Sequence, residues 1–559
     1  MGRKKSADIH RKAENDPLVF VLLLMIPIYG GYYTFSVLLC GVCLSVLLLV
    51  KALQEKHISL PVDAAGWCLY GICLCNLLSI PLAVSPGMAF VGLLRILVGA
   101  LFYIYAQSYT TERKNRILNS IAYEGVLLSF LSILSYFLTE NDLNGRLDGV
   151  FQYANTWAQY QMVCLILLGM KENRRSVDYI LMPVLLIGVF LTGSRSAILL
   201  MTAIAIGGGI LYAIRSKKVI SLVAAAAFLL LSGVAASLLS GGMVLKRISQ
   251  ITVSSSSLNG RLLYWKDGLE ILKKHPLGIG YGGYQYQQAT VQTGIYTVRY
   301  IHNEYLQAAM DGGIIAGLLL LALVCSLFLK KTNTKRERVV ILAIAVHSFC
   351  DFDLQFSAIL LLLLFCGSGE NRNTTFRPHK AAVWLICGIV SLFFLYFSVV
   401  YYCDYRGQYE ISYHLYPADL ELAEEYFMFA PSAEVAEEVA DRIIAKTDLS
   451  AVAWQFRFKT MTQRRDMEKA MAAGYRLLLL SRYEKNAWVE FTELLETAVS
   501  SERHRELVAM YAEAATEVLY QTIAQTGYLA WHIVDQPDFE FSGAILERLS
   551  ALYECVSEN

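Results

Sequence analysis

The sequence predicts an all-α polytopic membrane protein with about thirteen transmembrane helices and a C-terminal α-helical domain. Hydrophobic residues make up 56% of the chain and charged residues only 17%, against roughly 45–50% and 25% in an average soluble protein. The apolar residues form blocks of about 20, the length that a helix needs to cross a bilayer. Charge is also uneven: from Asp404 onward there are 27 acidic and 14 basic residues, whereas the preceding 403 residues hold 20 acidic and 34 basic ones.

Apolar blocks separated by polar breaks define the predicted spans. The spans cover residues 17–31, 32–53, 63–83, 86–108, 116–138, 154–170, 177–193, 195–214, 219–240, 304–329, 338–352, 356–369 and 381–403. The first two are joined by the tight turn IYGGYY, and the eleventh and twelfth are short. No small-residue cleavage site follows the basic start MGRKKSADIHRK, so we expect the first apolar stretch to be retained as a span.

Lysine and arginine in the short connections predict the orientation. The basic connections KALQEK, TERKNR, KENRR, RSKK, KKTNTKRER and ENRNTTFRPHK all fall on the side of the N-terminal segment 1–16. That side is expected to be cytoplasmic. We therefore predict a multi-pass plasma-membrane protein with a transmembrane domain at 17–403, its long loop 241–303 outside, and the acidic tail 404–559 also outside.

The tail has apolar residues at helical spacing, as in LELAEEYFMFAP and MEKAMAAGYRLLLLSRY. Short helices between polar breaks indicate stacked helical hairpins similar to degenerate tetratricopeptide repeats, although no strict 34-residue period is present. A single irregular helical bundle is the alternative.

Three residues on the predicted outer side are candidates for chemistry. Arg195 lies in the junction TGSRSA, Arg261 in the long loop, and His302 at the mouth of the tenth span, followed by Asn303 and Glu304. Two guanidinium groups suit a diphosphate because their donors match phosphate oxygens in pairs, and a histidine can serve as a general base at neutral pH. Simpler explanations exist for each part, since an arginine at a span end can extend to the headgroups and RLLYWKDGLEILKK can be an interfacial amphipathic helix.

Charged residues inside the spans are expected to have partners. Arg95 and Glu124, in neighbouring spans, are expected to pair with each other, and the alternative for Arg95 is contact with a carrier phosphate. His347 and Asp351 are four residues apart and so would share one helix face. We expect them to form a hydrogen-bonded pair, with Asp353 nearby, rather than half of a metal site.

Two other groups of residues have ordinary structural explanations. Asp267 and Glu270 lie beside three lysines on a predicted helix and are interpreted as surface charge. The 12 cysteines are mostly within apolar segments and lack disulfide or metal-ligand spacing, so we interpret them as small packing residues.

Four sequence pieces, taken in order, resemble the membrane O-antigen ligase and O-antigen polymerase superfamily, which includes bacterial protein O-oligosaccharyltransferases. They are GRLDGVFQYAN, LTGSRSAILL, GRLLYWKDGLEILKKHPLGIGYGGYQ followed by HNEYLQAAMDGGIIAGL, and HSFCDFDLQ. The resemblance covers roughly Gly145 to Gly367. Each piece alone is weak, whereas the ordered set on one side of the predicted spans is specific to the superfamily.

The resemblance implies a GT-C-like membrane domain that transfers a glycan from an undecaprenyl-diphosphate carrier to an acceptor hydroxyl at the outer face of a bacterial plasma membrane. Arg195 and Arg261 would hold the diphosphate, and His302 would activate the acceptor. Arg146 matches a basic position of less defined role. The supporting residues would be Asn303, Glu304, His347 and Asp351. Because a diphosphate is already a good leaving group, no general acid is required, and a single displacement would invert the anomeric centre without metal or cofactor.

The acceptor is not specified by the sequence. Ligases, polymerases and protein glycosyltransferases of the superfamily share the donor and differ in whether a lipid, glycan or protein accepts the sugar. The tail could dock the acceptor or a partner protein, and no nucleic acid is expected. The alternative functions are a polytopic transporter or lipid-linked glycan flippase, and a non-enzymatic assembly protein. No paired Gly- or Pro-interrupted spans indicate the two halves of a transporter, and the clustered arginines and histidine favour an enzyme.

Overall fold

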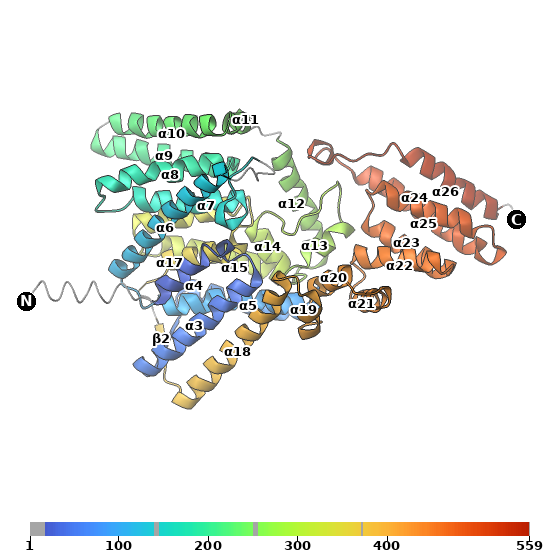
Figure 1. Cartoon of the computed structure of the whole chain (residues 1–559), viewed down its shortest axis with the longest axis horizontal. Coiled ribbons are helices and arrows are strands. Elements are labelled where there is room, and N and C mark those ends of the chain that lie inside the picture. The colour runs from blue at the N-terminus through green and yellow to red at the C-terminus, as the bar shows by residue number, and fades with distance from the viewer. Residues whose placement is uncertain (1–16, 139–144, 218, 250–254, 370–372, 558–559) are drawn as a thin grey trace, which may run out of the picture.

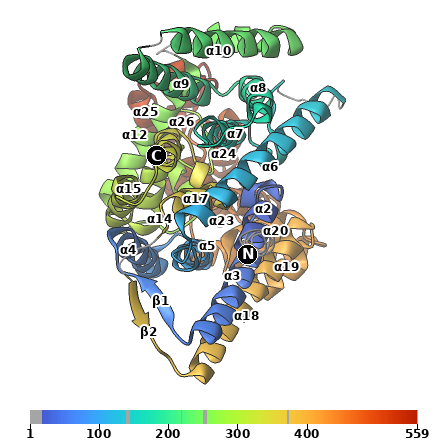
Figure 2. The ribbon, with the colours of Figure 1, turned by 90° about the vertical axis from the view of Figure 1, so that its left-hand side faces the viewer.

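The structure is a computed structural model that describes residues 17–138, 145–217, 219–249, 255–369 and 373–557. Its architecture is helical: a bundle of long helices lies side by side, and a smaller helical domain formed by the tail projects from one end (Figure 1). The one sheet in the described residues is the antiparallel pair β1 (Ile58–Pro61) and β2 (Asn373–Phe376), in which Ile58 faces Phe376. This pair lies at the end of the bundle away from the tail (Figure 2).

Helices occupy all thirteen predicted spans. They are α2 (Pro17–Met25), α3 (Thr34–Glu55), α4 (Ala64–Ser79), α5 (Pro86–Ala106), α6 (Thr111–Leu138), α7 (Ala154–Gly169), α8 (Ser176–Leu191), α9 (Arg195–Ser216), α10 (Ile220–Leu239), α14 (Glu304–Gly312), α15 (Ile314–Leu329), α16 (Lys335–His347), α17 (Ser357–Cys366) and α18 (Lys380–Tyr405). Short 3-10 helices η1 (Tyr29–Gly31), η2 (Ile80–Leu82), η3 (Gly149–Phe151) and η5 (Asp353–Gln355) lie between them.

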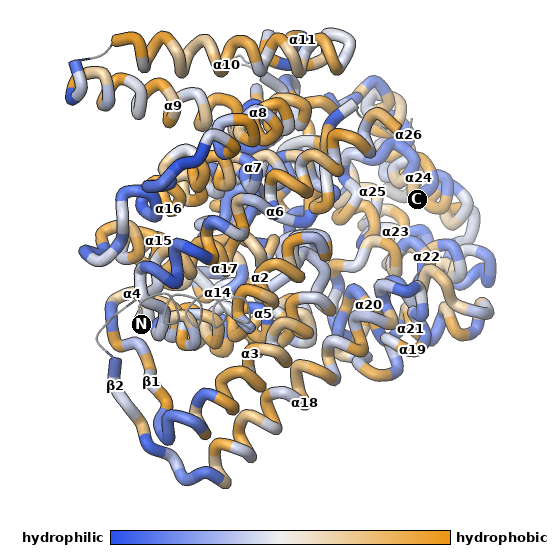
Figure 3. The backbone as a smooth tube through the Cα atoms, turned by 60° about the vertical axis from the view of Figure 1, so that its left-hand side comes forward, coloured by the Kyte–Doolittle hydropathy of each residue, from blue (hydrophilic) through white to orange (hydrophobic). Residues whose placement is uncertain are grey.

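Seven of the described helices are long and apolar enough to cross a membrane, and α8, α15 and α17 are shorter apolar helices. Several leave most of their apolar surface outside the protein core: only 11% of the span in α10 and 17% of that in α9 is buried. Apolar colouring covers most of these helices, whereas the tail alternates between polar and apolar residues (Figure 3). Unburied leucine-rich surface of this extent is stable in contact with lipid rather than water. The chain is thus a polytopic membrane protein, and the total of thirteen spans stays a prediction.

The predicted tenth span is two helices instead of one. The chain breaks at Gly313, whose φ of 88° is a conformation that favours glycine. The turn after α12 (Ser256–Lys274) packs into this break, where the Pro276 carbonyl accepts from Ile314 N at 3.0 Å and Ile279 N donates to the Met310 carbonyl at 2.7 Å. A Cβ at Gly278 would lie 2.5 Å from Gly313 N, so the two backbones approach too closely for a side chain. The long loop is thereby fixed to the bundle.

The rest of the long loop and the tail are also helical. The loop contains α11 (Met243–Ser249), α12, α13 (Tyr284–Gln287) and η4 (Gln288–Thr290). The tail contains α19 (Tyr409–Leu415), α20 (Leu420–Met428), α21 (Ala433–Lys446), α22 (Ala451–Gln463), α23 (Met467–Leu480), α24 (Lys485–Ala498), η6 (Glu502–His504), α25 (Arg505–Gln525), η7 (Ala530–His532) and α26 (Ser542–Ser557). Side chains of Asp419, Ser432, Ser450 and Asp466 cap four of these helices by accepting from first-turn N–H groups.

Consecutive tail helices pack on one another around two apolar cores. The helical nature of the tail is as predicted, and its likeness to tetratricopeptide repeats stays a prediction. The first tail helices dock on the bundle: a Cβ at Gly87 would lie 2.3 Å from the Ala418 carbonyl oxygen, and Arg299 of the long loop pairs with Glu421, with Nη2–Oε2 at 2.8 Å. The domain boundary near residue 404 is therefore bridged by direct contacts.

Candidate active site

The carboxylate of Asp351 is the centre of a polar cluster at the tail-bearing end of the bundle. It is completely buried and follows α16 in the short connection to η5. Four side chains contact it: Tyr153 (2.8 Å) and His302 (3.2 Å) at Oδ1, Asn155 (2.7 Å) and Arg261 (3.1 Å) at Oδ2. A buried carboxylate needs such partners. The carboxylate thus joins residues at the start of α7, in α12 and in the segment just before α14.

His302 is held in a conformation suited to a general base. Its φ of 55° is left-handed, a strained conformation for a residue with a side chain and one that recurs at functional sites. An ionised carboxylate can only accept hydrogen bonds, so Nδ1 carries the proton that is donated to Asp351. Nε2 then presents its lone pair. The rings of Phe352 and Tyr264 flank the imidazole, with centroids at 4.9 and 6.0 Å.

Four arginines gather around this cluster. Arg261 comes from the second turn of α12, and the charge of Asp351 raises its pKa above the usual value although burial opposes this. Arg195 begins α9 and lies within electrostatic reach of Arg261 and Arg247. Arg146 donates to the Thr192 carbonyl at 2.8 Å and to Asn155 at 2.6 Å. Burial and the charge of Arg247 lower the pKa of Arg146. Positive charge concentrated in this way attracts anions.

His347 lies in a second hydrogen-bonded chain beside the first. Its Nδ1 contacts Asp353 at 2.7 Å, and its Nε2 contacts the Ser196 hydroxyl at 3.0 Å. The predicted His347–Asp351 pair is therefore wrong. The helix α16 ends at His347, so the spacing that would place both residues on one helix face does not apply beyond it. These hydrogen bonds connect the first turn of α9, which carries Arg195, to α16 and η5.

Asn303 and Glu304 connect the histidine to the surrounding backbone. The Asn303 side chain caps α14 by accepting from Tyr305 N and Leu306 N, both at 3.0 Å. The buried Glu304 carboxylate accepts from Leu354 N at 2.7 Å, just after Asp353. Both residues hold the ends of the segments that carry the candidate site, and their supporting role stays a prediction.

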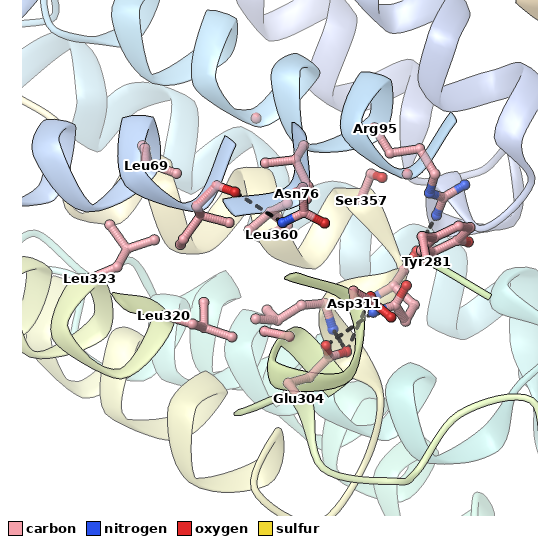
Figure 4. Close-up of a pocket in the computed structure, with 17 residues that line it drawn as sticks. Leu69, Asn76, Arg95, Tyr281, Glu304, Asp311, Leu320, Leu323, Ser357 and Leu360 are labelled. Atoms are coloured by element: carbon pink, nitrogen blue, oxygen red, sulfur yellow. Dashed lines mark hydrogen bonds between the residues drawn. The ribbon is translucent and has the colours of Figure 1, made fainter. Parts of the chain in front are cut away.

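An open cavity lies beside these residues, between α4, α5, α14, α15 and α17. Figure 4 shows Glu304, Asp311 and Arg95 toward one end, and leucines such as Leu320 and Leu323 toward the other. The cavity thus combines a polar part next to the His302 segment with an apolar part among the membrane helices.

The predicted ion pair between Arg95 and Glu124 is wrong. Arg95 donates to the carbonyls of Tyr32 (3.1 Å) and Gln355 (2.9 Å) and to the Thr34 hydroxyl (3.1 Å). Tyr32 follows η1 and Gln355 ends η5, and carbonyl oxygens at such helix ends are not used within a helix. Backbone acceptors therefore take the place of the expected carboxylate.

The prediction that Asp267 is a surface charge is also wrong. It is completely buried and accepts from Thr293 N and its hydroxyl and from the Tyr296 hydroxyl, at 2.8–2.9 Å. Burial raises the pKa of Asp267, and these hydrogen bonds oppose the rise. The carboxylate anchors α12 to the following loop. Glu270 does lie on the surface, paired with Lys273 at 2.6 Å.

Sequence reasoning missed several members of the cluster. Tyr153 and Asn155 lie within the recognised piece GRLDGVFQYAN, but nothing in it indicates that they contact Asp351. Arg247 follows the ninth predicted span, and a Cβ at Gly193 would lie 2.5 Å from its Cδ. A basic residue a few positions after a predicted span, on the predicted outer side, was the available signal.

Comparison with known proteins found one family model that matches part of the chain. Residues 180–321 match the family model described as O-antigen ligase. The match includes Arg195, Arg261 and His302, and leaves Arg146 and Asp351 outside it. No curated protein and no solved structure matches the chain. The match over residues 180–321 supports the resemblance of this part of the chain to the O-antigen ligase and O-antigen polymerase superfamily.

Proposed function

We propose that this protein transfers a glycan from an undecaprenyl-diphosphate donor to an acceptor hydroxyl at the outer face of a bacterial plasma membrane. The observation that carries the proposal is the shared Asp351 carboxylate, which holds His302 at 3.2 Å and Arg261 at 3.1 Å. One buried group thus orients both a base and a phosphate-binding side chain.

The arginines bind the leaving group in this mechanism. Arg195 and Arg261 hold the diphosphate through paired N–H donors. Arg146, which donates to Asn155, adds a further positive charge. These guanidinium groups balance the charge that grows on the diphosphate as the glycosidic bond breaks. The mechanism therefore uses neither a metal ion nor a general acid.

His302 activates the acceptor. Its Nε2 removes the proton from the acceptor hydroxyl while the hydroxyl oxygen attacks the anomeric carbon. The carbon–oxygen bond to the diphosphate breaks, and the imidazolium that forms is stabilised by Asp351. Because the acceptor enters opposite the departing diphosphate, this single displacement inverts the anomeric configuration.

The cavity beside the site offers a place for the carrier lipid. The leucines at its apolar end suit the first isoprenoid units, while its polar end lies toward the Glu304 segment. A carrier seated there would enter from the membrane with its diphosphate toward the arginines. The acidic tail would then lie on the same outer side as the acceptor.

Reconstitution with the lipid-linked oligosaccharide tests the function directly. We expect wild-type protein in proteoliposomes to transfer the glycan in the presence of a chelator, with inverted configuration by NMR. Replacing the base should reduce activity roughly 10²–10⁴-fold in His302→Ala. Mass spectrometry of the products would identify the acceptor.

A matched histidine provides the control. His275 follows the last residue of α12, roughly four turns from Arg261, and His275→Ala should retain activity within about twofold. Unchanged transfer by correctly inserted His302→Ala protein would refute the catalytic assignment. Equal loss in both variants would contradict it as well, because it would indicate a general disturbance of the loop.

A further inference from the structure

The connection between α25 and α26, residues 526–541, leaves the tail's helical stack and returns to the long loop. Figure 1 shows it reaching from the red end of the chain toward α12. Asn259 of α12 donates to the His532 carbonyl at 3.3 Å, and Ile533 packs with Leu263 and Tyr296 in a small apolar cluster. A Cβ at Gly294 would lie 2.9 Å from the Ala530 Cβ. The connection is thus fixed against the helix that carries Arg261.

This connection exposes large apolar side chains outside the membrane helices. Tyr528 is 67% exposed, Trp531 42% and Val534 79%. The two aromatic rings are nevertheless held in place. Tyr528 stacks on His532 with ring centroids 3.9 Å apart, and Trp531 packs edge-on against Phe539. Fixed aromatic surface that faces water is costly unless a partner covers it, and Tyr and Trp lose little entropy on binding one.

The connection is also adjacent to the candidate active site. Tyr264, whose ring lies 6.0 Å from that of His302, packs against the same apolar cluster as Ile533. The exposed carboxylate of Asp535 acts electrostatically on Tyr264. A substrate chain that extends outward from His302 along α12 would therefore meet residues 526–541.

The composition of the connection selects the class of partner. Its sequence TGYLAWHIVDQPDFEF has three acidic residues and no lysine or arginine, so it does not suit phosphate groups or the anionic surface of a membrane. Sugar rings have apolar C–H faces that stack on aromatic rings, and hydroxyl groups that donate to carboxylates and amides. Asp535, Gln536 and Asp538 are exposed and supply these acceptors.

From these contacts we propose that residues 526–541 form a glycan-binding surface that holds the sugar units of the substrate beside the site. Tyr528 and Trp531 stack on sugar rings, and Asp535 and its exposed neighbours accept from sugar hydroxyls. The proposal rests on the proposed function, because it takes a glycan as the substrate. It assigns the tail to substrate binding in addition to its structural contacts.

Isothermal titration calorimetry of the full-length protein in detergent tests the surface. The probe is the free oligosaccharide released by mild acid from the lipid-linked donor. We expect Tyr528→Ala and Trp531→Ala each to weaken its Kd about five- to tenfold, the value of one aromatic contact. Tyr520→Ala is the matched control: it removes a 59% exposed tyrosine from α25 and should leave the Kd unchanged. Equal thermal melting of all variants would verify their folding.

The outcomes separate this proposal from the proposed function. His302→Ala should bind the oligosaccharide with wild-type Kd, because binding needs no base. No transfer by wild-type protein, together with weaker binding in Tyr528→Ala and Trp531→Ala, would refute the proposed function and support the surface. No binding by wild type, or one Kd for all variants, would overturn the surface. Vesicle binding that depends on Trp531, with no oligosaccharide binding, would overturn it too and indicate a lipid partner.

Discussion

At the scale of single residues, the site depends on how one carboxylate is shared. Asp351 has both oxygens occupied, with His302 on Oδ1 and Arg261 on Oδ2. Neither partner contacts the other through any hydrogen bond that the described residues form. The positions of the proposed base and of the proposed phosphate-binding group are therefore set by a residue that itself need not touch the substrate.

A double-mutant cycle on this carboxylate tests its positioning role. We expect Asp351→Asn to reduce kcat by the loss of base orientation and to raise the KM for the donor by the loss of Arg261 orientation. Because His302 and Asp351 would act as one unit, the double variant with His302→Ala should have nearly the kcat of His302→Ala alone. Additive losses of kcat would instead indicate two independent effects.

At the scale of elements, short breaks in helices build the site and the cavity beside it. The interruption at Gly313 admits the turn after α12, and the end of α16 at His347 frees the connection that carries Asp351. The start of α9 is fixed by the Ser196–His347–Asp353 chain. Arg195 is thereby placed by hydrogen bonds from elements more than a hundred residues away in sequence.

Replacing His347, the middle residue of the hydrogen-bonded chain Ser196–His347–Asp353, should displace the start of α9. In His347→Leu the Ser196 hydroxyl and the buried Asp353 would each lose a partner. Because Asp353 keeps Thr156 and Ser348, the cost should lie at the lower end of the about 1–3 kcal/mol of an unsatisfied buried group. We expect a lower melting temperature and a raised KM for the donor with a smaller change in kcat. A fall in kcat alone would show that His347 acts in the chemical step instead.

Filling the cavity should distinguish carrier binding from chemistry. Gly99 lines the cavity, and a Cβ there would make only ordinary contacts, the nearest at 3.4 Å from Leu360. Gly99→Leu should raise the KM for the undecaprenyl donor and affect a short-chain prenyl donor less. Gly388→Leu on α18, where a Cβ would meet nothing within 4 Å, is the matched control. Equal effects on both donors would refute the proposed lipid position.

At the scale of the whole molecule, the tail is attached to the bundle and to the long loop at separate places. The first tail helices meet α5 and Arg299, and the α25–α26 connection meets α12. Asp419 lies at the first of these contacts, completely enclosed, and accepts from the Tyr401 hydroxyl. Burial, with the charge of Glu421, raises the pKa of Asp419 to about 6.

This raised pKa predicts how the attachment depends on pH. The folded protein binds a proton at Asp419 more tightly than the unfolded chain does, so its stability should increase as the pH falls from about 7 toward 4. Asp419→Asn retains a helix-capping acceptor and removes the charge. We expect its free energy of unfolding at pH 7 to exceed that of wild type by at most about 3 kcal/mol, and its melting temperature to be higher. Both differences should shrink at pH 5. A difference in melting temperature that does not change with pH would contradict the assignment.

Much of the fold could be predicted because bilayer length and apolar composition determine the helices of a membrane domain. The breaks could not, since Gly313 is one of many glycines and the turn that packs into it lies far away in sequence. The same limit explains the errors at Arg95 and Asp267, whose partners belong to irregular segments without a charge pattern. The candidate residues Arg195, Arg261 and His302 could be selected from ordered motifs on one predicted side, whereas Tyr153 and Asn155 join the cluster only through their contacts with Asp351.

The shared carboxylate has a consequence for the order of events. A donor diphosphate seated on Arg261 competes with Asp351 for that guanidinium, and the carboxylate is then left to hold His302. We therefore expect the imidazole to be fully oriented toward an acceptor only after the donor has arrived. An empty enzyme would leave acceptors unactivated, and a loaded one would favour the hydroxyl that enters next. Such coupling would make binding sequential, with the lipid-linked sugar first.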